Sequence, residues 1–165
     1  MRILNLLCTL GVAGLLGGCG EKSATFESKP PAKHGHKPLH GGTPVVLGNE
    51  EYHIELVRDA AAGKLQAYVM DGELENFVRI PAESFEVVAQ LSGRPEILVF
   101  SAVASNATGE KIGDTSWFEA EAGWLKTTET FDAVLKELIV RGKKFEHVAF
   151  SFPKGNDSDE MGKRQ

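Results

Sequence analysis

A pair of alternating segments joined by a loop of small residues constrains the fold more than any other feature of the chain. Apolar and polar residues alternate from Tyr52 to Asp59, and they alternate again from Lys64 to Asp71. A period of two is typical of a β-strand with one buried face. The intervening residues 60–63 end in a glycine, which takes the positive φ that such loops often need. The sequence therefore predicts a β-hairpin here.

The hydrophobic pattern also selects the register of this hairpin. With a four-residue loop over 60–63, Ile54 faces Val69 and the apolar residues stay on one side. A five-residue loop would set Ile54 against Tyr68 and mix the two faces. We therefore choose the four-residue loop. This register also pairs Leu56 with Ala67, His53 with Met70, and Glu55 with Tyr68.

Short strand signals continue along the chain at intervals of roughly 8–15 residues, with turn residues between them. We expect strands at 45–47, 85–89, 97–102, 116–120 and 145–152, and a strand or a connection at 74–80. Convincing helices are few. This pattern predicts an all-β fold, an antiparallel immunoglobulin-like β-sandwich over residues 40–153.

Residues 130–144 fit two structures. Phe131, Leu135 and Leu138 have helical spacing, and Thr130 is suited to cap a helix. Against a helix, the composition of residues 138–140 favours a strand, and residues 141–144 resemble a hairpin turn. We favour a strand over 135–140, because a partner strand satisfies the backbone of the last strand better than a lone helix does.

Residues 1–18 have the features of a secretory signal peptide. Arg2 supplies a positive charge, the stretch from Ile3 to Leu16 is uncharged and mostly apolar, and small residues follow it. As a helix, the apolar stretch spans about 21 Å, which is short of the ~30 Å hydrocarbon core of a bilayer. We therefore expect removal of residues 1–18 rather than a permanent transmembrane helix.

The residues Leu16-Gly17-Gly18-Cys19 resemble the lipobox of bacterial lipoproteins. This resemblance implies cleavage before Cys19, diacylglycerol on its thiol and acylation of the new amino terminus. Two or more chains anchor a protein stably to a membrane. The next residue is Gly20 and not aspartate. The resemblance therefore implies a periplasm-facing protein on the outer membrane rather than the inner one, if the envelope is Gram-negative.

The residues that flank the predicted domain are polar. Residues 19–39 contain three prolines and too few apolar side chains to repay their ordering entropy. We expect a lipidated flexible linker over 19–39, which spans about 25 Å as a coil. A disordered tail is expected over 154–165.

Composition excludes several classes of function. The formal net charge of −5 argues against binding to nucleic acid or to a membrane through a basic patch. The two cysteines are Cys8, in the signal peptide, and Cys19. The mature domain therefore has neither a disulfide nor a thiol nucleophile. No motif of serine hydrolases, zinc proteases or nucleotide-binding enzymes occurs, so we expect a binding or interaction protein and not an enzyme.

Histidines are the residues best suited to carry chemistry. His34, His36 and His40 lie close together in the sequence, and His53 and Glu55 share one face of the hairpin. Imidazole is the commonest protein ligand for zinc, copper and nickel. We predict a site for one of these metals formed by His40, His53 and Glu55, helped by His34 and His36. The alternative is that the linker histidines bind nothing and that His53 is a surface residue of a strand.

A short segment carries a second resemblance. HGG at residues 40–42, followed by YHIELV at 52–57, is similar to segments of small bacterial envelope lipoproteins. It also resembles N-terminal regions of the periplasmic adaptor subunits of heavy-metal efflux pumps. The resemblance implies a β-sandwich associated with metal homeostasis, with His40, His53 and Glu55 as the motif positions. The chain lacks the long helical hairpin and lipoyl-like domain of such adaptors, so an accessory metal-binding protein is implied.

Two functions follow from these features. The first is a lipid-anchored envelope protein that binds a transition metal as an accessory to metal homeostasis or efflux. The second is a structural or protein-interaction lipoprotein without a metal, docking on an envelope partner through a sheet edge or residues 117–124. The first predicts that His53 and Glu55 face solvent within reach of His40. The second predicts an exposed apolar patch of several hundred Å².

Overall fold

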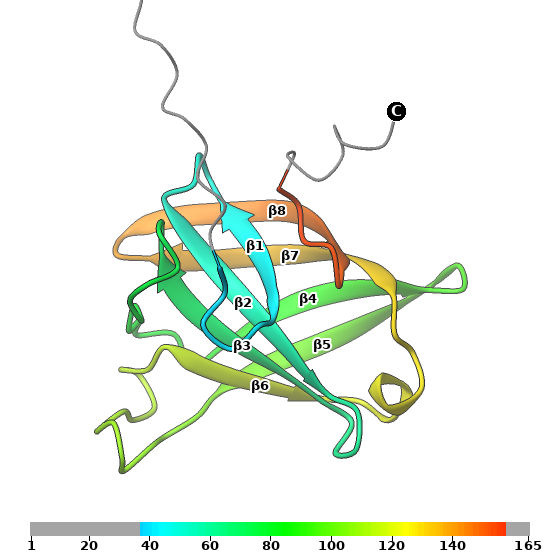
Figure 1. The fold of residues 1–165 in the computed structure, drawn as a ribbon, viewed down its shortest axis with the longest axis horizontal. Coiled ribbons are helices and arrows are strands. Elements are labelled where there is room, and N and C mark those ends of the chain that lie inside the picture. The colour runs from blue at the N-terminus through cyan, green and yellow to red at the C-terminus, as the bar shows by residue number, and fades with distance from the viewer. Residues whose placement is uncertain (1–36, 158–165) are drawn as a thin grey trace, which may run out of the picture. The chain divides into compact units, whose positions relative to one another are not determined.

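A computed structural model describes residues 37–157 of the chain. The predicted signal peptide, Cys19, His34 and His36 lie outside the described residues, as do residues 158–165. Eight strands and one short 3₁₀ helix form the described part (Figure 1). They are β1 (Thr43–Leu47), β2 (Tyr52–Asp59), β3 (Lys64–Asp71), β4 (Ser84–Leu91), β5 (Arg94–Ala102), β6 (Trp117–Glu121), η1 (Gly123–Lys126), β7 (Phe131–Val140) and β8 (Lys143–Phe152).

The eight strands belong to one antiparallel sheet, so the all-β antiparallel prediction is confirmed. The order across the sheet is β1-β2-β3-β6-β5-β4-β7-β8. An immunoglobulin domain divides its strands between two separate sheets. Here a single sheet curls instead, and its two edge strands, β1 and β8, come into contact. The curled sheet encloses the core on its inner face.

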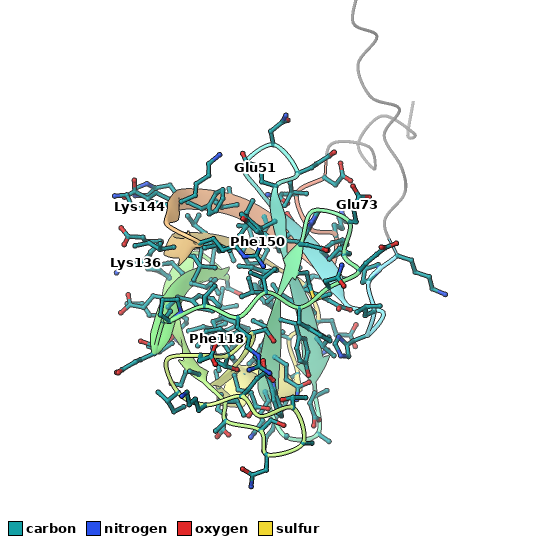
Figure 2. All side chains as sticks on the ribbon, turned by 90° about the vertical axis from the view of Figure 1, so that its left-hand side faces the viewer. Glu51, Glu73, Phe118, Lys136, Lys144 and Phe150 are labelled. Atoms are coloured by element: carbon teal, nitrogen blue, oxygen red, sulfur yellow. The ribbon has the colours of Figure 1, made fainter. Side chains whose placement is uncertain are left out.

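The core is held by large apolar side chains that alternate along the strands. Phe85 stacks on Phe100 with ring centroids 4.9 Å apart, and it meets Phe118 edge-on at 5.2 Å. Figure 2 shows Phe118 and Phe150 inside the curled sheet, whereas Lys136 and Lys144 lie at its surface. Burying one such phenylalanine contributes about 1.5–3 kcal/mol, so apolar packing is the main source of stability for the described residues.

The hairpin of β2 and β3 has the predicted register. Ile54 pairs with Val69, His53 with Met70, and Glu55 with Tyr68. Gly63 has a φ of +71°, and its N–H donates to the carbonyl of Asp59 at 2.9 Å. The four-residue loop is therefore confirmed.

The ambiguous segment after residue 130 is a strand, as favoured. β7 pairs with β8 along its length, and Val140 faces Lys143 across a tight turn. Arg141 and Gly142 both have positive φ, at 48° and 81°. This is the combination that a two-residue type I′ turn requires, and its twist matches that of the flanking strands.

The domain extends past the boundary that the sequence suggested at residue 153. Asn156 accepts from the N–H of Val46 at 2.7 Å and donates to the carbonyl of the same residue at 3.1 Å. Gly155 lies so close to β1 that a side chain there would collide with the carbonyl oxygen of Pro44. Asn156 thus satisfies backbone groups at the edge of β1, and the folded domain continues at least to this residue.

Between residues 37 and 157, no helix has the length and apolarity that a bilayer crossing demands.

Candidate functional site

Part of the outer face of the β2–β3 hairpin is buried, although strand alternation predicts that this face is in contact with solvent. His53 is 2 % exposed and Glu55 is 0 % exposed. Met70, directly opposite His53, is also fully buried. The chain around the hairpin covers this face. Residues 71–80 fold back along β3, where Phe77 forms a bridge with Met70, and His53 Nδ1 lies 3.2 Å from the carbonyl oxygen of Asp71.

Residues 38–42 cover the other end of this outer face, and Glu55 holds them there. The Glu55 carboxyl accepts from the backbone N–H of His40 at 2.7 Å and from that of Gly42 at 2.9 Å. Its second oxygen lies 2.9 Å from His40 Nδ1. A buried carboxyl group needs such partners to offset its lost hydration. Glu55 therefore fastens the segment that precedes β1 to the sheet.

The metal site that the sequence suggested is not formed in the predicted way. The structure brings His40 and Glu55 together, but as a hydrogen-bonded pair whose carboxyl group is inaccessible. His53 is buried and not solvent-facing, which contradicts the geometry that the hypothesis required. Among residues 37–157, no three His, Cys, Asp or Glu side chains gather as metal ligands do. Metal binding by His34 and His36 stays a prediction, because both lie outside the described residues.

Four aromatic rings lie side by side on the outer face instead. The ring of His40 stacks on Tyr68 with centroids 4.1 Å apart and 19° between the planes. Tyr68 and Trp117, paired across β3 and β6, are nearly parallel at 6.1 Å. Phe77 tilts toward both His40, at 5.8 Å, and Tyr68, at 6.1 Å. The sheet register places Tyr68 beside Trp117, Glu55 holds His40 against Tyr68, and Phe77 lies against the side of this row.

A polar loop borders these rings, and Glu110 organises it. Glu110 accepts from the backbone N–H of Ser116 at 2.8 Å, from the Ser116 hydroxyl at 2.6 Å and from the Thr108 hydroxyl at 2.6 Å. Arg79 donates to the carbonyl of Thr108 at 2.5 Å and lies 3.5 Å from Asp114. Burial by itself raises the pKa of Glu110, but the hydrogen bonds from Ser116 and Thr108 and the charge of Arg79 outweigh it and lower the pKa.

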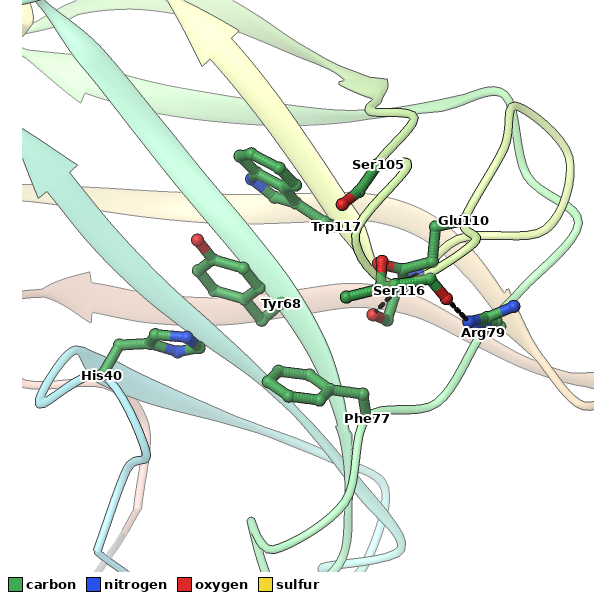
Figure 3. A pocket seen from close by; sticks show the side chains of 9 residues that line it. His40, Tyr68, Phe77, Arg79, Ser105, Glu110, Ser116 and Trp117 are labelled. Carbon is green, nitrogen blue, oxygen red and sulfur yellow. Dashed lines mark hydrogen bonds between the residues drawn. The ribbon is translucent and has the colours of Figure 1, made fainter.

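Between the rings and this loop lies a cleft of about 280 Å³ (Figure 3). Its walls are mainly aromatic and its rim is polar, the composition typical of small-molecule sites. Burial, aided by the nearby carboxylates Glu119, Glu55 and Glu110, raises the pKa of Tyr68. We refer to this site as the aromatic cleft. Its lining residues are His40, Tyr68, Phe77, Arg79, Ser105, Thr108, Glu110, Ser116 and Trp117.

One donor in the aromatic cleft lacks an acceptor. The indole Nε1 of Trp117 is buried and has no hydrogen-bond partner within residues 37–157. Figure 3 shows this nitrogen on the ring edge that faces Tyr68. A buried donor without a partner costs about 1–3 kcal/mol, so an acceptor that reaches it is favoured.

Two residues that the sequence singled out, His40 and Trp117, line the aromatic cleft. Docking of a partner through residues 117–124 stays a prediction. Trp124 packs edge-on against Phe131, which belongs to the core. Arg79 and Glu110 were missed because both lie in irregular segments, where no periodic pattern indicates which residues meet.

Comparisons of the chain with protein families, with curated proteins and with solved structures found no match. The resemblance to envelope lipoproteins and efflux adaptors therefore stays a prediction.

Proposed function

We propose that this protein is a lipid-anchored binding protein of the bacterial envelope, and that the aromatic cleft binds a ligand with an apolar face. The observation that carries the proposal is the gathering of four aromatic rings around a cleft on the outer side of a sheet. An outer face of an antiparallel sheet is ordinarily polar and solvated. A row of aromatic side chains on such a face therefore favours a role in binding.

Exposure of the rings supports the same conclusion. The side chain of Phe77 is 49 % exposed and lies outside the buried core. Its neighbours Tyr68 and Trp117 are only partly buried. Burial of apolar ring surface is favourable, and these rings lack part of it while they face water. A bound ligand would bury that surface.

The anchor in this proposal is Cys19, acylated after removal of residues 1–18. The polar linker over 19–39 then carries the domain on the periplasmic side of the membrane, with the outer membrane favoured over the inner. We propose no catalytic role. A carboxylate with a lowered pKa, such as Glu110, is a weak general base at neutral pH.

A second candidate is docking of an envelope protein without a small ligand. Ile97 and Val99 of β5 are exposed on the outer face, and Ile97 pairs there with Val88 of β4. Exposed apolar side chains on adjacent strands favour protein contact. Photo-crosslinking in intact cells tests this candidate. Docking on this face predicts a protein adduct with a photo-reactive probe at position 97 and none with the same probe at position 129.

The main proposal is tested by NMR with a library of small aromatic and alicyclic fragments. We expect the fragments to shift the signals of Phe77 and Trp117 and to leave those of Ile112 unchanged. Fragment binding that clusters away from the cleft, or no binding at all, would refute the proposal. Labelling with a fatty acid, lost in Cys19→Ala, tests the anchor.

A further inference from the structure

We infer that the ligand of the aromatic cleft is a carbohydrate, bound through the C–H face of a pyranose ring. The inference rests on the proposed function and specifies the class of ligand. Three properties of the cleft lead to it: aromatic walls, a rim of hydroxyl and charged groups of both signs, and an indole donor that lacks an acceptor.

The aromatic walls suit the apolar face of a sugar. The face of an aromatic ring is electron-rich and attracts weakly positive C–H groups. A pyranose presents several such C–H groups on one face while its hydroxyls project from the edge. Phe77 is half exposed and Trp117 partly so, so both have surface left for such a contact. Tyr68, between His40 and Trp117, keeps the row of rings in place.

The rim suits the hydroxyl edge of the same ring. Arg79 has five N–H donors in a planar fork, and its contacts with Thr108 and Asp114 engage only part of them. Glu110 accepts from Ser116 and Thr108, and a carboxylate has about four acceptor positions. Neighbouring donors and acceptors held at fixed positions match vicinal hydroxyls, each of which both donates and accepts.

The unpaired indole distinguishes a sugar from an organic cation. Aromatic clefts also bind quaternary ammonium groups by cation–π attraction. Such a cation has no acceptor for the Nε1–H of Trp117, so this buried donor stays unpaired when a cation binds. A sugar hydroxyl supplies the acceptor and carries no charge. The volume of about 280 Å³ lies just below the range of roughly 300–1,000 Å³ for ligand pockets, which fits one sugar unit of a longer chain.

Tryptophan fluorescence tests the inference directly. The chain has two tryptophans, so Trp124→Phe leaves Trp117 as the only one. We would titrate the full chain carrying Cys19→Ser and Trp124→Phe with an N-acetylglucosamine tetramer and with cellotetraose. We expect saturable quenching by at least one of them, with a Kd between roughly 10 μM and 1 mM.

A matched pair of variants locates the binding. Phe77→Ser removes an exposed ring of the cleft, and Ile112→Ser removes an equally exposed side chain that does not line it. We expect Phe77→Ser to weaken the oligosaccharide about tenfold or more, and Ile112→Ser to leave its affinity within about twofold. Circular dichroism confirms that both variants are folded.

The outcomes separate the two proposals. If fragments bind the cleft but neither oligosaccharide quenches Trp117, the carbohydrate inference is wrong and the proposed function stands. If neither fragments nor oligosaccharides bind, both are wrong. Saturable quenching by tetramethylammonium alone would overturn the inference in favour of a cation. Oligosaccharide binding that Phe77→Ser does not weaken would also overturn it.

Discussion

Replacement of Glu55 by alanine tests whether this buried carboxyl group fastens residues 38–42 to the sheet. Its partners are the backbone N–H groups of His40 and Gly42, at 2.7 and 2.9 Å, and the His40 ring at 2.9 Å. All of them come from the segment that precedes β1. Removal of the carboxyl group therefore leaves a whole segment without its attachment, rather than one isolated donor.

The magnitude follows from these contacts. Each hydrogen bond to a charged or buried acceptor contributes about 1–3 kcal/mol, and each donor left unpaired costs a similar amount. If residues 38–42 detach, their N–H groups can hydrogen-bond to water instead, which limits the loss of folding free energy. We therefore expect Glu55→Ala to lower the free energy of unfolding by about 2–4 kcal/mol. Glu55→Gln keeps one acceptor oxygen and should cost about half as much.

Urea unfolding and amide hydrogen exchange measure the two consequences. The matched control is Glu137→Ala, whose side chain is 52 % exposed, and its stability should change by no more than about 0.5 kcal/mol. In Glu55→Ala the amide of Gly42 should exchange much faster than in the parent protein. A loss below about 0.5 kcal/mol, together with unchanged protection of Gly42, would refute the role assigned to Glu55.

Three further predictions concern the core, the pH dependence and the C-terminal segment. Phe118→Ala, at a fully buried position, should lower the free energy of unfolding by about 3–5 kcal/mol in urea; a loss below about 1 kcal/mol would contradict the packing described. The folded-state pKa of Glu110 lies below its ordinary value of 4.5. Glu110 therefore stabilises the fold above that pH, and the contribution disappears as the pH falls through the folded-state pKa. Glu110→Gln should flatten the acid side of a stability–pH curve, and an unchanged curve would argue against this. Gly155→Ala places a side chain against the carbonyl of Pro44 at a φ of +78°. It should lower the free energy of unfolding by about 1–3 kcal/mol, and an unchanged melting temperature would contradict the close approach.

The parts of the fold that sequence predicts well are those set by local pattern. The pairing of Ile54 with Val69 follows from alternation and loop length alone, because a shift by one residue would mix apolar and polar side chains on each face. The strand over 135–140 is predictable because the backbone N–H and C=O groups of β8 require a partner strand. The single curled sheet is harder to foresee, since it depends on which strands become neighbours after long connections.

The prediction that His53 and Glu55 face solvent was wrong for a physical reason. Alternation identifies the two faces of β2, but it does not reveal what covers the outer one. His53 and Glu55 share that face as predicted, yet residues 38–42 and 71–80 lie over it and bury both side chains. A charged residue on the outer face of a strand is ordinarily solvated, and Glu55 is the exception because the chain supplies its donors.

The arrangement of the aromatic cleft could not be predicted from the sequence for a related reason. Tyr68 and Trp117 meet because β6 pairs with β3, although the 45 residues 72–116 separate the two strands in the sequence. Phe77, Arg79 and Glu110 come from irregular segments. Only the three-dimensional pairing brings these side chains to one place.

The hydrogen bonds that join Thr43 to Pro153 and Val46 to Asn156 bring the beginning and the end of the folded chain together. The path of the backbone is therefore almost a closed circle. A short linker can connect these two ends, and the chain can be opened at the exposed turn of Ser92 and Gly93 without removing a strand pair. Such a circular permutant keeps every neighbour in the sheet while starting at β5. The fold thus depends on which strands are neighbours in the sheet and not on where the chain starts.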